Sequence, residues 1–151
     1  MLSRSPLNLS TLTLMLLHIY RIDYCPARLL DAAVVMAGTH TVVVYDVLPW
    51  RNVPLNGLAS IETSEEVEKG VRKCSAKLSA TLCGLRLALP DEPLAYRLHT
   101  VSGTVYLLGT SLPPYPLTTQ MESLPSSAAE TSAVSLSVSL TGKEHGLLRM
   151  L

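Results

Sequence analysis

The chain has 151 residues, with 12 Lys and Arg against 12 Asp and Glu, and 48% of its residues are apolar. This length favours one domain, and the apolar content at zero net charge argues against disorder along the whole chain. Balanced charge also argues against nucleic-acid binding, which requires a surplus of clustered Lys and Arg. The three cysteines do not form the even set of a disulfide framework, so we expect the core to lie in a reducing, cytosolic compartment.

The N-terminal part of the chain, residues 1–35, is apolar, and its first acidic residue is Asp23. Arg4 followed by an apolar stretch is typical of a secretory signal peptide, and the lack of acidic residues is also typical of a mitochondrial presequence. The third interpretation is an N-terminal extension or an additional packed helix, with Met36 as the natural initiator. After this segment we expect a core domain over residues 36–112.

Two strands and one long helix open the predicted core. The β-branched run at residues 41–48 predicts a central strand buried on both faces, and residues 58–61 predict a short second strand. Thr63-Ser64-Glu65-Glu66 fits a capping box at the start of a helix. Apolar residues then recur at steps of three and four: Val67, Val71, Cys74, Leu78, Leu82 and Leu85. This spacing predicts an amphipathic helix over residues 65–85.

A hairpin and a C-terminal strand complete the predicted elements. Residues 94–101 alternate in polarity, Ser102-Gly103 supplies a turn, and residues 104–109 return as an apolar strand. Residues 113–133 are rich in Pro, Ser and Thr, which predicts a linker. Residues 134–151 are expected to hold a half-buried edge strand and a tail, with the apolar face of the strand on the core or on a partner. That face consists of Val134, Leu136, Val138 and Leu140.

The sequence contains no recognisable catalytic, cofactor or metal motif. CxxC pairs are absent, and so are the GxSxG, GxGxxG and GxxxxGK[ST] patterns. A hydrolase that uses His99 with Ser102 or Cys83 would need an orienting carboxylate, so a surface histidine is the favoured interpretation. We therefore predict no enzymatic activity, no cofactor, no metal site and no small-molecule substrate.

The order strand, turn, short strand, helix and hairpin resembles the longin-like family. This family includes small subunits of the TRAPP tethering complex, small chains of coat adaptors and N-terminal domains of some SNAREs. The likeness lies within residues 40–112 and is carried by Tyr96-Arg97-Leu98-His99, Val101-Ser102-Gly103 and the strand at residues 104–110. The resemblance implies an α+β fold, in which one long amphipathic helix packs across a small antiparallel sheet. It also implies a non-enzymatic subunit of a vesicle-tethering or coat-type complex, located in the cytoplasm and associated with the ER or Golgi.

Two groups of residues are candidate contacts for the protein subunits of such a complex. The first is the apolar face of the C-terminal strand, described above. The second is a basic face of the predicted helix, formed by Arg72, Lys73 and Lys77. It is either a solvated surface or a contact for an acidic partner or anionic lipid, which would give peripheral membrane association. The alternative function is an uncharacterised binding domain that residues 1–35 direct to the secretory pathway or the mitochondrion.

Overall fold

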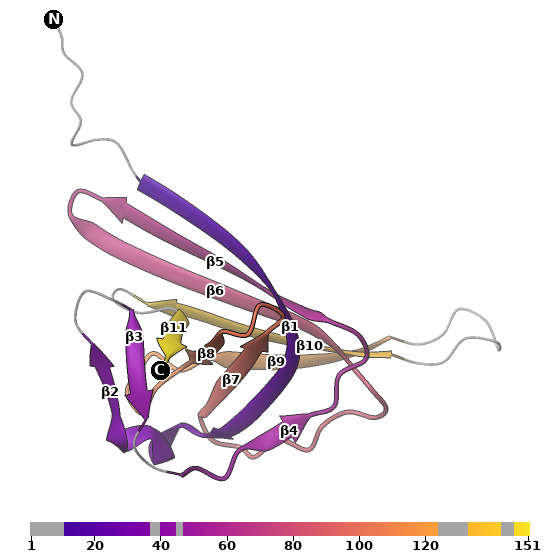
Figure 1. The fold of residues 1–151 in the computed structure, drawn as a ribbon. Coiled ribbons are helices and arrows are strands. Elements are labelled where there is room, and N and C mark those ends of the chain that lie inside the picture. Colours follow the sequence, from indigo (N-terminus) through magenta and orange to yellow (C-terminus); the bar gives the residue numbers. More distant parts are fainter. Residues whose placement is uncertain (1–10, 37–39, 45–46, 124–132, 143–146) are drawn as a thin grey trace, which may run out of the picture.

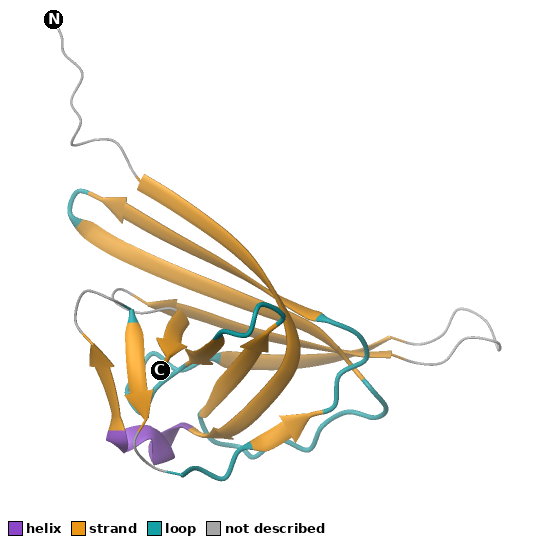
Figure 2. Ribbon diagram, viewed as in Figure 1, coloured by secondary structure: helices purple, strands orange, loops and turns teal. Residues whose placement is uncertain are grey.

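The computed structural model describes residues 11–36, 40–44, 47–123, 133–142 and 147–151. This part of the chain forms one sheet and a single short 3-10 helix, η2 (Ala27–Ala32), and it contains no α-helix (Figure 2). The strands, in chain order, are β1 (Thr11–Pro26), β2 (Ala33–Met36), β3 (Thr41–Val44), β4 (Arg51–Val53), β5 (Ala59–Glu68), β6 (Val71–Leu82), β7 (Leu94–Thr100), β8 (Val105–Leu108), β9 (Leu117–Ser123), β10 (Ala133–Gly142) and β11 (Leu147–Met150). The predicted α+β fold of the longin type is therefore wrong.

The sheet runs in the order β2-β3-β11-β8-β7-β1-β5-β6-β10-β9, and β4 pairs with β1 outside this path (Figure 1). Its pairs are antiparallel except for β3 with β11, which are parallel. Strand β1 belongs to two parts of the sheet, because its N-terminal part pairs with β5 and its C-terminal part pairs with β7 and β4. The register shifts between Ile19 and Arg21, where one part gives way to the other.

The sheet folds over on itself, so that its two parts face each other across a core. Tyr96 on β7 and Thr118 on β9 lie far apart in the strand order, yet their hydroxyl oxygens are 2.6 Å apart. The side chains between them alternate along each strand, which is the period expected when one face of a sheet is buried. They form the main core, whose largest fully buried members include Ile19, Ile22, Ile61, Leu78, Tyr96, Leu98 and Leu136.

The residues predicted as one helix form the hairpin of β5 and β6. Its two-residue turn is Lys69-Gly70, and both residues have positive φ, at 52° and 78°. Such backbone angles match the twist of a tight hairpin and are disfavoured within a helix. The apolar steps of four place Cys74, Leu78 and Leu82 on one face of β6 just as they would on a helix, because four is also a multiple of the strand period.

The other predicted strands agree with the structure to different degrees. The hairpin at residues 94–109 is confirmed as β7 and β8, and the C-terminal strand is confirmed as β10. Strand β10 lies between β6 and β9, however, so its prediction as an edge strand is wrong. Strand β3 covers residues 41–44 and is only partly buried, and residues 45–46 lie outside the described residues.

The segments predicted as an N-terminal extension and as a linker contain β1, most of β2, and β9. Strand β1 falls within the N-terminal segment and occupies the middle of the sheet, and β9 falls within the segment rich in Pro, Ser and Thr. Residues 58–61, predicted as a short strand, contribute the start of the longer strand β5.

Candidate functional site

A buried carboxylate, Asp23, is the centre of a polar cluster on the face of β1 and β7 that lies opposite the main core. Its position follows from the register, which sets Asp23 between Arg97 on β7 and Asn52 on β4 and pairs Arg21 with His99. Only 1% of the Asp23 surface is exposed. The Arg97 Nε and Nη2 atoms donate to Asp23 Oδ2 at 3.0 and 2.8 Å, and His99 Nε2 lies 3.1 Å from the same oxygen. Arg21 Nε donates to Oδ1 at 3.2 Å.

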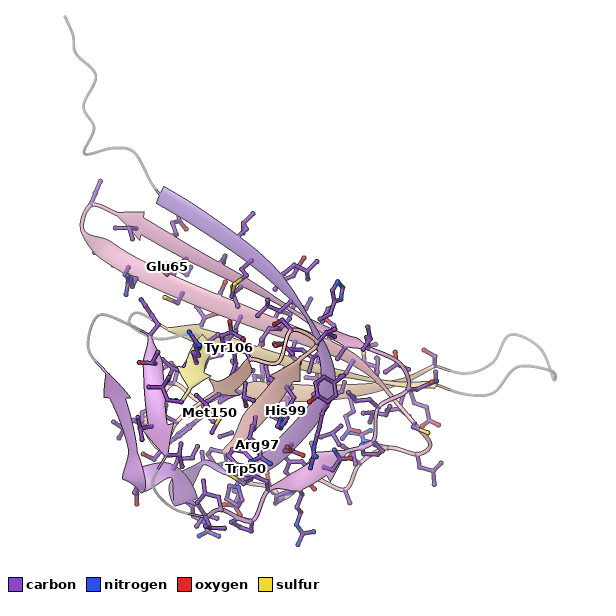
Figure 3. The ribbon with its side chains drawn as sticks, viewed as in Figure 1. Trp50, Glu65, Arg97, His99, Tyr106 and Met150 are labelled. Atoms are coloured by element: carbon purple, nitrogen blue, oxygen red, sulfur yellow. The ribbon has the colours of Figure 1, made fainter. Side chains whose placement is uncertain are left out.

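The two arginines keep this carboxylate ionised. Burial by itself raises the pKa of Asp23. The hydrogen bonds and positive charges of Arg97 and Arg21 together lower the pKa by more than burial raises it, so it lies below its ordinary value of 3.8. The Arg97 guanidinium also lies 4.7 Å from the ring centroid of Trp50, a cation–π contact. Figure 3 shows Trp50, Arg97 and His99 close together beside β7.

The cluster supplies the orienting carboxylate for His99 that the sequence did not reveal. The described contacts do not bring the suggested nucleophiles to this histidine. The Ser102 hydroxyl lies 2.9 Å from the hydroxyl of Thr100, whose side chain is buried on the opposite face of β7. Cys83 follows β6, and its backbone N–H donates to the carbonyl of Pro54. The cluster therefore holds β1, β4 and β7 together and shows no assembled nucleophilic triad.

A pocket of about 450 Å³ lies beside this cluster, between the end of β1 and the loops around residues 49–51 and 88–92. Cys25 forms part of its wall. Burial raises the pKa of the Cys25 thiol to about 11, although the charge of Arg97 acts in the opposite direction. This thiol is therefore protonated at neutral pH and is a poor nucleophile. The Arg28 Nε atom donates to Glu92 Oε1 at 3.0 Å at the rim, so opposite charges meet there.

The second candidate site is the unpaired side of residues 11–17 of β1, which we call the β1 edge. These residues pair with β5 on one side, whereas the pairing of β1 with β7 starts only at Ile19. Within the described structure, no strand covers the other side of residues 11–17. Leu14, Met15 and Leu16 are 71%, 40% and 54% exposed. In Figure 1, β1, β5 and β6 extend together beyond the rest of the fold, so the β1 edge borders this projecting part.

The residues predicted as partner contacts belong to β6 and β10, not to β1. The apolar side chains of β10 are buried in the main core, which leaves no surface of these side chains for a partner: Val134, Leu136, Val138 and Leu140. The basic residues do not form a basic face, because Lys73 is paired in register with Glu66 and Lys77 with Glu62. Arg72 is on the other face of β6, where its Nη2 lies 2.7 Å from Glu65 Oε1.

Sequence reasoning missed the β1 edge, although a signal for it was present. Residues 11–14 read Thr-Leu-Thr-Leu, an alternation typical of a strand. The apolar run that follows them was instead interpreted as a targeting segment, an N-terminal extension or a packed helix, none of which predicts a strand. The Asp23 cluster gave no local signal at all, because Arg97 and His99 are 74 and 76 residues away in the chain.

Comparisons of the chain with protein-family models, with curated proteins and with solved structures each found no match. The described residues include no helix with the length and apolar character that a membrane span requires. In the same part of the chain, no three His, Cys, Asp or Glu residues are grouped so that they could hold a metal ion.

Proposed function

We propose that the protein is a non-enzymatic interaction module, which binds an extended segment of a partner protein by strand addition at the β1 edge. The observation that carries this proposal is the exposure of Leu14, Met15 and Leu16 on a strand whose outer side has no partner in the described structure. An edge strand presents unpaired backbone N–H and C=O groups, and another chain can pair with them.

The β1 edge differs from the sheet edge formed by β9. Natural edge strands are blunted by charged residues and prolines, which oppose pairing with other chains. Strand β9 carries Glu122 and directly follows Pro116. Residues 11–17 contain neither a charged residue nor a proline. An edge without these features is suited to pairing, so the β1 edge is the better contact surface.

The partner that we propose is a subunit of a vesicle-tethering or coat-type complex, which keeps the functional prediction from the sequence. The contact would use the edge of a strand, since the helix face expected of a longin-like domain is absent from the described structure. The competing prediction places residues 1–35 in a cleaved targeting segment. Strand β1 pairs with β4, β5 and β7. We propose that residues 11–26 stay in the mature protein, because cleavage after them would remove the middle of the sheet.

Hydrogen exchange tests the strand addition directly. The probe is a soluble peptide of alternating Thr and Val between Gly-Ser ends, added to dilute protein. We expect it to slow amide exchange at residues 11–17. Leu14→Lys should weaken this protection, whereas Leu112→Lys should leave it unchanged, because Leu112 is 70% exposed but lies outside β1. Unchanged exchange at residues 11–17 at saturating peptide would contradict the proposed function.

Site-specific crosslinking in cells tests the class of partner. A photo-reactive amino acid at position 16 should form adducts with a subunit of such a complex, a second copy of this chain included, and these adducts should co-purify with tethering, coat or SNARE components. The same group at position 112 should not form them. Adducts that co-purify with none of these components would contradict the trafficking role and leave strand addition in place. Sequencing the N-terminus of the cellular protein separately tests whether residues 11–26 are retained.

A further inference from the structure

We infer that the segment bound at the β1 edge is the β1 edge of a second copy of this chain, paired antiparallel about a two-fold axis at Met15. This inference rests on the proposed function, because it names the partner strand for the same edge. The protein would then form a symmetric dimer, in which β1 of one copy continues the sheet of the other.

The absence of charged side chains from the β1 edge permits this self-pairing. Two identical edges that carry Lys or Glu can bring like charges directly opposite each other, and such contacts are unfavourable. Residues 11–17 carry no charged side chain, so no register of this segment with itself opposes like charges. On the neighbouring strand β5, Glu62 is in register with Leu16 and is paired across the hairpin with Lys77. Opposite charges are therefore in register beside the edge within each copy.

The pattern of exposed side chains selects the register about Met15. Leu14 and Leu16 lie on the same face of β1, because side chains two residues apart point to the same side of a strand. With Met15 on the axis, Leu14 lies opposite Leu16 of the second copy, and Leu16 lies opposite its Leu14. The leucines at positions 14 and 16 of both copies then form one patch. A parallel arrangement could not be related by this two-fold axis.

The symmetry also explains why pairing would stop at two copies. An isologous contact uses the same surface on both chains, so one contact covers both β1 edges and leaves neither free for a third copy. Sterically, β1, β5 and β6 extend beyond the rest of the fold in Figure 1. Antiparallel pairing of these projecting strands directs the remainder of each copy toward opposite ends of the shared sheet.

The test measures the dimerisation constant of the full chain by sedimentation equilibrium. We expect the wild type to dimerise, and Leu14→Glu or Leu16→Lys alone to weaken dimerisation about tenfold, because each change alters two cross-strand pairs per dimer. Combining the two changes should restore dimerisation, since the new carboxylate at position 14 then faces the new ammonium group at position 16 of the second copy. Leu112→Lys is the matched control, and circular dichroism checks that each variant is folded.

Three results would overturn the inference. The first is a wild type that stays monomeric at all concentrations. The second is a double variant that dimerises no better than the single variants, which would exclude this register. The third is exchange protection at residues 11–17 that stays constant as the concentration of the wild type rises, because dimerisation should increase this protection. If the protein stays monomeric and the Thr-Val peptide still protects the β1 edge, only the dimer is refuted. If neither the peptide nor a second copy protects the β1 edge, the proposed function is refuted as well.

Discussion

Replacing Asp23 by Asn tests the electrostatic role of the buried carboxylate while keeping the size of the side chain. One oxygen, Oδ2, lies within hydrogen-bonding distance of Arg97 and His99, and the other, Oδ1, accepts from Arg21 at 3.2 Å. In the variant the amide oxygen can take the place of Oδ2. The amide NH2 group then faces the Arg21 donor, and the positive charge of Arg97, which is 24% exposed, loses its counter-charge.

Removing one partner of a buried ion pair costs roughly 3–5 kcal/mol, because the other charge stays desolvated. Arg97 retains some contact with water, so we expect Asp23→Asn to lower the free energy of unfolding at pH 7 by about 3 kcal/mol. Arg21→Gln is the control. The Arg21 side chain is 51% exposed, so its ion pair is screened by solvent and its loss should cost less than about 1 kcal/mol.

The pH dependence of this effect has a definite sign. The pKa of Asp23 is lower in the folded protein than its ordinary value of 3.8, so its contribution to stability is complete above that value and is lost as the pH falls through the folded-state pKa. In urea unfolding followed by circular dichroism, the stabilities of wild type and Asp23→Asn should therefore converge at acid pH. A loss under about 1 kcal/mol at pH 7, or a difference independent of pH, would refute this electrostatic account.

Substitutions at Leu78 and Gly70 distinguish the hairpin from the predicted helix, and thiol labelling tests the burial of the cysteines. Leu78→Ala should cost about 2–5 kcal/mol in urea unfolding, because Leu78 is fully buried, whereas Leu85→Ala should be nearly neutral at 84% exposure; equal effects would contradict the packing of β6. Gly70→Ala should destabilise the protein by about 1–2 kcal/mol, since φ is 78° there, whereas a helix would gain stability from the same change. A thiol reagent at pH 8 should label the exposed Cys83 rapidly and the buried Cys25 only upon unfolding, and mass spectrometry of the labelled peptides decides the matter.

Strand periodicity was readable from the sequence where only one interpretation fitted it. The strict alternation of serine and apolar residues around Leu136 has no helical equivalent, and β10 forms there. The steps of four from Cys74 through Leu82 suit either period, and the inward-facing Ala76 and Ala80 between them are too small to have settled the matter. Acidic residues before residue 70 and basic residues after it fit a helix dipole, but they also fit two strands that face each other.

The Asp23 cluster could not be predicted in the same way, because it depends on which distant strands become neighbours. Nothing local to Asp23 indicates that β7 will lie on one side of it and β4 on the other. Likewise, the exposure of Leu14 and Leu16 follows from where β7 ends relative to β1 and not from any property of residues 11–17 themselves. Such information is carried by the topology of the sheet.

The division of β1 between two parts of the sheet affects the order in which the protein can fold during synthesis. Arg97 follows Asp23 by 74 residues, so the C-terminal half of β1 has left the ribosome long before β7 exists to pair with it. Contacts of such long sequence separation slow folding, because a large loop must close before they form. During that interval the side of β1 that β7 will cover stays open, and open strand edges of this kind are what chaperones shield from aggregation.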